Sequence, residues 1–304
     1  MANNNKKRHF VQLLSSIAVN GNFKGFFNGR IYTGKTKKIC VPILNCYSCP
    51  GALGACPIGS LQAVIGSIKY NISYYVLGFM SLIGVMFGRL VCGWLCPFGF
   101  IQDLLYKIPT KFKLTVSKKV NNILKYLKYA VFAIFVLILP MTLRDQFGMS
   151  DPYFCKYICP AGTLEAGIPL TLLNKSLRSA IGFLFNWKVL LLITIVILSI
   201  SVYRVFCRYI CPLGAFYSLF NSISFYKIKV DKDKCINCNA CTNNCKMNIE
   251  VYKKPNSAEC IRCGDCIKSC PTGAIKSGIF IDNERFKAKK VNTYNAKLGK
   301  SSNS

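Results

Sequence analysis

Two cysteine blocks near the C-terminus, CINCNACTNNC at residues 235–245 and CIRCGDCIKSC at residues 260–270, share the spacing C-x2-C-x2-C-x3-C. In two-cluster iron–sulfur proteins with this spacing, the fourth cysteine of each block ligates the other cluster. Zinc is the alternative, because C-x2-C pairs also suit a tetrahedral site, but zinc does not require three cysteines at two-residue steps. We therefore predict two [4Fe–4S] clusters, one held by Cys235, Cys238, Cys241 and Cys270 and the other by Cys260, Cys263, Cys266 and Cys245.

The residues that follow the second block favour the same interpretation. Cys270 precedes the segment PTGAI (residues 271–275), a close match to bacterial two-cluster ferredoxins. The first block departs from that pattern, since lysine and methionine follow Cys245 where proline is usual, but no ligand is lost. We expect residues 225–276 to form a small ferredoxin-like α+β domain whose clusters stabilise a core too small to hold alone.

The rest of the chain is strongly apolar, and 52% of all residues are hydrophobic. Three uncharged runs, at residues 72–88, 129–143 and 189–203, approach the roughly 20 residues needed to cross about 30 Å of hydrocarbon. Buried core helices are the alternative for runs this short, but aromatic residues flank these runs as they flank membrane spans. A weaker candidate at residues 10–27 is interrupted by polar residues and fits a re-entrant or interfacial segment. No small-residue cleavage site follows it, so we do not interpret it as a removable signal peptide.

These features predict an α-helical integral membrane protein with three firm spans, a fourth weaker candidate and a C-terminal two-cluster ferredoxin-like domain. The expected boundaries are a membrane domain at 1–224, the ferredoxin-like domain at 225–276 and a basic tail at 277–304.

Charge indicates the orientation of the spans. The chain has 40 Lys and Arg against 11 Asp and Glu, but the basic residues lie mostly in loops between spans, as the positive-inside rule describes, and not in a nucleic-acid-binding surface. The loop at residues 107–128 carries seven lysines. Three spans then place this loop and the ferredoxin-like domain on the cytoplasmic side of the cell membrane. Lys35, Lys37 and Lys38 would lie outside, which leaves the N-terminal topology open.

Cysteine pairs follow each expected span in a repeated pattern, C-x3-C-P-x-G. The copies are CGWLCPFG at 92–99, CKYICPAG at 155–162 and CRYICPLG at 207–214, with a variant copy at 46–59. Proline is tolerated in the first turn of a new helix. Both thiols of each pair can therefore lie at a junction between two helices.

Four placements in one motif favour cluster ligation over simple burial of cysteine, with redox thiols or disulfides as the alternative for the outer pair. Counting spans puts two pairs on the inner side, where we expect one shared cluster on Cys92, Cys96, Cys207 and Cys211. The opposite side collects five candidates, one more than a cluster needs, with Cys46 or Cys56 as the uncertain member: Cys46, Cys49, Cys56, Cys155 and Cys159. Cys40 lies outside every motif and is expected to be structural.

This combination of motifs resembles the membrane polyferredoxin family over roughly residues 53–275. Members include the membrane component that passes electrons from quinol toward periplasmic nitrate reductase, and the C-terminal half of the nitrous-oxide reductase regulator. The resemblance implies a membrane-bound iron–sulfur electron carrier with one or two clusters beyond the ferredoxin pair. It also implies redox proteins as partners, often outward-facing flavin proteins, with quinone as a further candidate.

Several chemistries are excluded. His9 is the only histidine, so no histidine pair can bind a haem within the membrane. Nucleotide-binding glycine motifs and a Ser/His/Asp nucleophile are also missing from the sequence, so we expect a carrier of electrons and not a catalyst. Two alternatives remain open: a redox-sensing regulator or metalloenzyme-maturation factor on the same scaffold, and a Cu(I)- or zinc-binding or transport protein.

Overall fold

The computed structural model describes residues 2–67, 73–110, 113–114, 116–146, 148–179 and 181–280. The predicted basic tail lies, from residue 281 onward, outside the described residues. The described residues are mostly helical and carry one two-stranded sheet near the C-terminus, so the predicted class, helical with a ferredoxin-like end, is confirmed in outline.

The elements follow the cysteine motifs along the chain. The first part contains α1 (Ala2–Val19), α2 (Phe23–Asn28), the 3₁₀ turn η1 (Lys35–Lys38), α3 (Pro57–Gly66), α4 (Tyr74–Phe87), α5 (Leu90–Trp94) and α6 (Pro97–Lys107). The middle contains α7 (Lys118–Val131), the π-helical segment η2 (Phe132–Ile138), α8 (Leu139–Thr142), α9 (Tyr153–Tyr157), α10 (Pro160–Gly162), the π-helical η3 (Thr163–Gly167), α11 (Ile168–Leu173) and α12 (Lys175–Ser179). The last part contains α13 (Phe183–Ser201), α14 (Val205–Tyr209), α15 (Pro212–Phe220), β1 (Tyr226–Val230), α16 (Ala240–Asn243), α17 (Asp265–Lys268) and β2 (Ile275–Ile279).

Two helices within the described residues are long and apolar enough to cross a membrane. One is the continuous helix Lys119–Thr142, formed by α7, η2 and α8, and the other is α13. Most of their side chains are not buried inside the protein, as expected for helices that face lipid. Two of the three predicted spans therefore correspond to helices of full length.

The remaining predicted span, residues 72–88, corresponds to a shorter helix. Helix α4 has 14 residues and rises about 21 Å, less than the hydrocarbon thickness. It ends at Gly88, whose φ of 52° is unfavourable for residues with a side chain. Three full-length spans are thus not observed in the part of the chain that the structure describes.

The weak candidate at residues 10–27 divides into two helices, because the chain turns at residues 20–22 between α1 and α2. Helix α1 packs against α5 and α6. Its Gln12 Nε2 donates to the Gly93 carbonyl, and near its other end the Val19 carbonyl accepts from the Leu53 N–H. Its outer face is apolar and exposed at Phe10, Leu13, Leu14 and Ile17.

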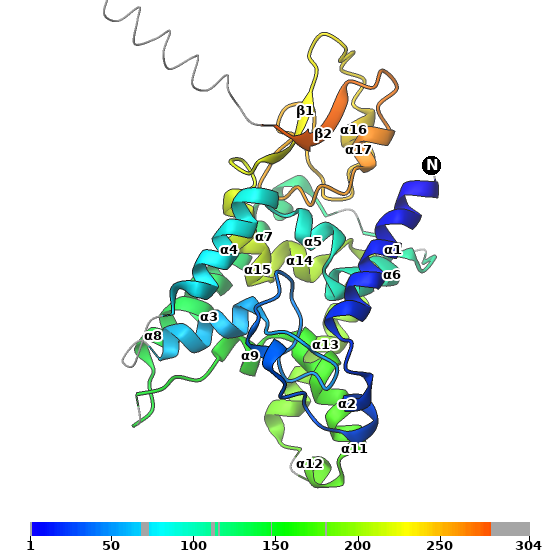
Figure 1. Cartoon of the computed structure of the whole chain (residues 1–304). Coiled ribbons are helices and arrows are strands. Elements are labelled where there is room, and N and C mark those ends of the chain that lie inside the picture. The colour runs from blue at the N-terminus through cyan, green and yellow to red at the C-terminus, as the bar shows by residue number, and fades with distance from the viewer. Residues whose placement is uncertain are drawn as a thin grey trace, which may run out of the picture.

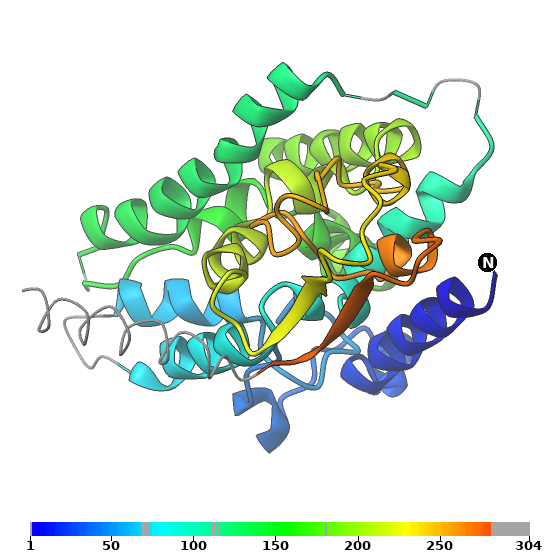
Figure 2. The same cartoon turned by 90° about the horizontal axis from the view of Figure 1, so that it is seen from above.

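The elements are stacked along one axis (Figure 1). The ferredoxin-like region with β1 and β2 lies at one end, α5, α14 and α15 lie beneath it, α3 and α9 follow, and α11 and α12 lie at the far end. Strands β1 and β2 are antiparallel, with Tyr226 opposite Ile279 and Val230 opposite Ile275. Seen from above, this sheet lies over the helices, with α1 at one side (Figure 2).

Candidate metal centres

The ferredoxin-like region contains two small cavities lined by cysteines. The four that line the first are Cys235, Cys238, Cys241 and Cys270. The four that line the second are Cys245, Cys260, Cys263 and Cys266. The fourth cysteine of each block therefore lies with the first three of the other block, as the spacing predicts. Cys238 is exposed, so the first set is the one nearer to solvent.

The C-P motifs form helix junctions of one design. In each, the second cysteine has an extended backbone and directly precedes a helix whose first residue is proline. These helices are α3 after Cys56, α6 after Cys96, α10 after Cys159 and α15 after Cys211. In the three regular copies the first cysteine lies in the short preceding helix, α5, α9 or α14, so both thiols lie at the junction as predicted.

The four predicted inner cysteines are buried and lie close to one another: Cys92, Cys96, Cys207 and Cys211. The surrounding hydrophobic core also includes Cys56 and Cys159 of the outer set. Burial raises the pKa of the Cys211 thiol well above its usual value, and the negative charges of the other three thiolates would raise it further. Four such thiols ionise together only if a cation binds them. This donor set therefore suits an iron–sulfur cluster.

Two buried arginines support this inner group. Arg89 Nη2 donates to the Cys207 carbonyl at 3.0 Å, and Arg204 Nη1 donates to the Cys92 carbonyl at 2.7 Å. Arg204 is paired with Asp103. Burial alone would raise the pKa of Asp103, but the guanidinium lowers this pKa to about 2. Positive charge next to a cluster of thiolates offsets the cost of burying them.

The ferredoxin-like region lies directly on the inner group. An added Cβ on Gly93, between Cys92 and Cys96, would meet the carbonyl oxygen of Ile261 at 2.2 Å, so only glycine fits. Trp94 Nε1 donates to the Arg262 carbonyl at 3.0 Å. Ile261 and Arg262 belong to the second block, so a loop of the ferredoxin-like region contacts helix α5 of the inner group.

A buried ion cluster fixes the same contact. Glu259, immediately before the second block, accepts from Arg89 Nη1 at 3.0 Å and from Lys128 Nζ at 2.5 Å. Both cationic side chains are fully buried. Glu259 thus joins the ferredoxin-like region to Arg89 beside the inner group and to Lys128 of α7.

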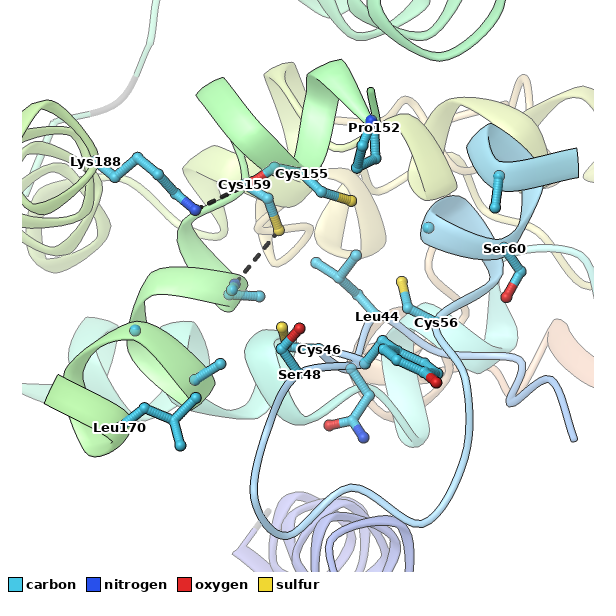
Figure 3. Close-up of a pocket in the computed structure, with 18 of the residues that line it drawn as sticks. Leu44, Cys46, Ser48, Cys56, Ser60, Pro152, Cys155, Cys159, Leu170 and Lys188 are labelled. Atoms are coloured by element: carbon cyan, nitrogen blue, oxygen red, sulfur yellow. Dashed lines mark hydrogen bonds between the residues drawn. The ribbon is translucent and has the colours of Figure 1, made fainter. Parts of the chain in front are cut away.

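The outer cysteines surround a cavity of about 690 Å³ (Figure 3). Cys46, Cys56, Cys155 and Cys159 line it, and their sulfurs face a common space around Leu44 in Figure 3. Cys49, although described, is not in the lining; it lies near Lys37 and Glu165. The structure therefore places both Cys46 and Cys56 with the pair and Cys49 outside the lining, whereas we expected Cys46 or Cys56 to be the uncertain member.

The charges beside the outer group differ from those beside the inner one. Burial raises the pKa of Glu165 to about 7, although the Cys46 N–H donates to its carboxylate at 2.7 Å and lowers it. Lys188 of α13 lines the cavity and donates to the Cys155 carbonyl at 3.1 Å. Cys40 is buried near Cys56, outside the lining of the cavity, in keeping with a structural role.

Tyr217 of α15 lies between the two groups. It is fully buried, and its hydroxyl donates to the Pro42 carbonyl at 3.0 Å, on the loop that leads to Cys46. Burial raises its pKa, and thiolates of the inner pair Cys92 and Cys96 and of Cys56 on the outer side would raise it further. Tyr217 is therefore close to both groups.

Two glutamines that we did not predict from the sequence also contact these sites. Gln62 Nε2 lies 3.4 Å from Cys155 Sγ, and Gln102 Nε2 lies 3.2 Å from Cys207 Sγ. Each follows the C-P cysteine of its own motif by six residues, so aligning the repeats would have revealed them. Within the described residues, no three His, Cys, Asp or Glu side chains converge as a site for a single metal ion.

Comparison with known proteins agrees with this cysteine chemistry. A family model described as a 4Fe-4S binding domain matches residues 75–115, 127–169 and 185–232, and a second model of that description matches residues 254–276. The protein MJ0750 of Methanocaldococcus jannaschii is 34% identical over 72% of this chain and 84% of its own length. The chain belongs to the membrane polyferredoxin family.

Two further relatives carry ferredoxin-type names. The ferredoxin-type protein NapH of Haemophilus influenzae is 25% identical, over 83% of this chain and 80% of the relative. The methylamine utilization ferredoxin-type protein MauN of Paracoccus denitrificans is 24% identical, over 67% of this chain and 62% of the relative. These matches identify the protein as a 4Fe-4S ferredoxin-type electron-transfer protein. No solved structure matches the chain.

Proposed function

We propose that this polyferredoxin relays electrons through four iron–sulfur clusters between a redox partner on the ferredoxin side of the cell membrane and another at the outer face. The observation that carries the proposal is the sequence of four cysteine sets along one axis of the molecule. In order, they are the set containing Cys238, the set containing Cys263, the inner group and the outer group.

The first transfer would occur within the ferredoxin-like region. The exposed position of Cys238 suits exchange with a soluble partner. The second set lies on the inner group through the contact of Gly93 with Ile261. Electron tunnelling falls steeply with distance, so a contact too close for a side chain favours transfer between the two sets.

The next step runs from the inner to the outer group. Tyr217 supplies a packed route: its helix begins directly after Cys211, and its hydroxyl donates to a carbonyl of the loop that leads to Cys46. We propose that it shortens the gap through packed and hydrogen-bonded atoms, without itself being oxidised.

The proposed topology has two full-length crossings, the helix Lys119–Thr142 and α13, with the two helices α1 and α4 running alongside them. Helix α1 descends from the level of Gly93 to the level of Leu53, α4 returns, the helix Lys119–Thr142 descends and α13 returns. The N-terminus and the ferredoxin-like domain then share the cytoplasmic side, where most loop lysines lie. Lys37 stays on the outer side, buried, with Nζ donating to the Ala52 carbonyl at 2.8 Å.

The donor and acceptor are proposed from chemistry alone. The open outer cavity suits transfer to an exported redox protein, for which a flavin protein is the candidate, or to a quinone. The direction of electron flow depends on those partners. No contact within the described residues favours a regulatory or copper-transport role over electron transfer.

Anaerobic purification of the full-length protein tests the proposal. Four [4Fe–4S] clusters correspond to about sixteen iron atoms and about sixteen acid-labile sulfides per chain. About half those amounts would restrict clusters to the ferredoxin-like region. Stoichiometric zinc or copper without sulfide would refute the proposal.

A further inference from the structure

Gln62 and Gln102 make the same pair of contacts at two different sites. Each side chain is buried, and each amide oxygen accepts a backbone N–H: Gln62 Oε1 from Phe154 at 2.9 Å, and Gln102 Oε1 from Phe206 at 3.1 Å. Each amide nitrogen faces the sulfur of the next residue, Cys155 or Cys207.

The orientation of each amide follows from its partners. Besides the sulfur, Gln62 Nε2 donates to the Ile58 carbonyl at 3.2 Å, and Gln102 Nε2 donates to the Phe98 carbonyl at 3.3 Å. An amide has two N–H donors, which these two acceptors use. In the flipped orientation, the amide oxygen would face a backbone carbonyl and the NH₂ group would face a backbone N–H. Both hydrogen bonds to the backbone would then be lost. An N–H therefore points at the sulfur in both sites.

The repeat explains why the contact occurs twice. Each glutamine lies on the helix that follows one C-P motif and reaches the first cysteine of another motif from later in the chain. The corresponding positions of the other two motifs hold Glu165 and Tyr217. Two of the four motifs carry the glutamine, and each cysteine group therefore contains one glutamine.

We propose that Gln62 and Gln102 are positioning residues that each donate an N–H···S hydrogen bond to one cluster ligand and thereby raise the reduction potential of that cluster. The inference rests on the ligand sets of the proposed function. Reduction adds negative charge to a cluster, and hydrogen bonds to its sulfurs favour the more negative state. Partners of the ligands tune a metal site in this way generally.

Redox titration of the full-length protein, followed by electron paramagnetic resonance, tests the inference. Gln102→Met keeps side-chain volume but removes the donor, and Gln102→Glu also keeps the acceptor for the Phe206 N–H. Both should lower the midpoint potential of the inner cluster, with about a tenfold change in the reduced-to-oxidised ratio, or about 59 mV for one electron. The outer cluster should keep its potential.

Gln62→Met and Gln62→Glu should lower the midpoint potential of the outer cluster and leave that of the inner cluster unchanged. The control Gln146→Met, on an exposed turn, should change neither potential. Unchanged potentials in the Gln62 and Gln102 variants, or equal shifts of both clusters in each, would overturn the inference. Signals are assigned by their loss in the cysteine variants of each group. A wild-type protein without membrane-cluster signals would instead refute the proposed function, and this inference with it.

Discussion

The inner and outer cysteine groups are built from the same motif but have different surroundings. The inner group is closed by a ferredoxin loop and by the buried side chains of Arg89 and Arg204. The outer group lines a cavity of about 690 Å³, next to Glu165 and Lys188. One local structure can therefore serve as an internal relay or as a terminal site, depending on what packs against it.

The charges extend this difference. The inner thiolates lie beside two guanidiniums that are each paired with a buried carboxylate. The outer thiolates lie beside Glu165, whose pKa burial raises to about 7, and beside the ammonium group of Lys188. The predictions that follow test whether the groups are separate sites with separate surroundings.

The largest effect should come from removing ligands. Cys96→Ser/Cys211→Ser should abolish the inner cluster and Cys155→Ser/Cys159→Ser the outer one, each with loss of about four iron atoms. Cys40→Ser/Cys49→Ser is the control and should keep all iron, because neither residue lines the outer cavity. Iron analysis and spectroscopy measure this; loss of a cluster in the control would show that the outer ligand set is wrong.

Next in size is Glu259→Gln, which leaves the buried cations Arg89 and Lys128 without their carboxylate. Removing one partner of a buried ion pair costs about 3–5 kcal/mol, so the free energy of unfolding in detergent should fall by about that amount. Glu250→Gln is the control: its pair with Lys253, at 3.3 Å, is exposed and screened by solvent, so its loss should change the free energy of unfolding little. Equal effects in a denaturant titration would contradict a buried inner contact.

Gly93→Ala tests the contact between the ferredoxin-like region and the inner group. The new methyl group would meet the Ile261 carbonyl, and overpacking of this kind costs about 1–3 kcal/mol. Magnetic coupling between the second ferredoxin cluster and the inner cluster should also weaken. Gly78→Ala, where nothing lies within 4 Å of the added Cβ, should change neither property; unaltered coupling in Gly93→Ala would argue against close docking.

The smallest effect is expected for Tyr217→Phe. It removes one hydrogen bond, to the Pro42 carbonyl, for about 0.5–1.5 kcal/mol, and it should slow electron transfer between the inner and outer clusters. Tyr126→Phe, at an exposed tyrosine, is the control. Flash-reduction kinetics measure the step, and identical rates in both variants would remove Tyr217 from the path.

Much of the site could be predicted because the cysteine spacing is short-range. The crossed positions of Cys245 and Cys270 follow from two eleven-residue blocks. The structure groups the 92 and 207 motifs apart from the 155 motif, while the side of the membrane that counting spans gives to each stays a prediction. These inferences need only helix periodicity and the side of the membrane on which each motif lies. Whether the gathered thiols hold clusters stays a prediction.

Other features depend on tertiary contacts that spacing does not encode. The path of the 46–56 loop places Cys49 outside the lining of the outer cavity. The sequence alone does not distinguish Cys49 from the other two thiols of this loop. Helix α4 ends at Gly88, where the predicted apolar run also ends, and its 14 residues are too few for a full span. The left-handed backbone of Arg204, at φ 51°, turns the chain after α13 so that its guanidinium reaches Asp103.

The most direct test of a path through the membrane uses sealed vesicles of uniform orientation, loaded with a low-potential donor and surrounded by an impermeant dye. Wild-type protein should reduce the external dye. Cys96→Ser/Cys211→Ser and Cys155→Ser/Cys159→Ser should each abolish dye reduction, while Cys40→Ser/Cys49→Ser should retain it. Dye reduction that survives unchanged in both double variants would contradict electron transfer through the inner and outer groups.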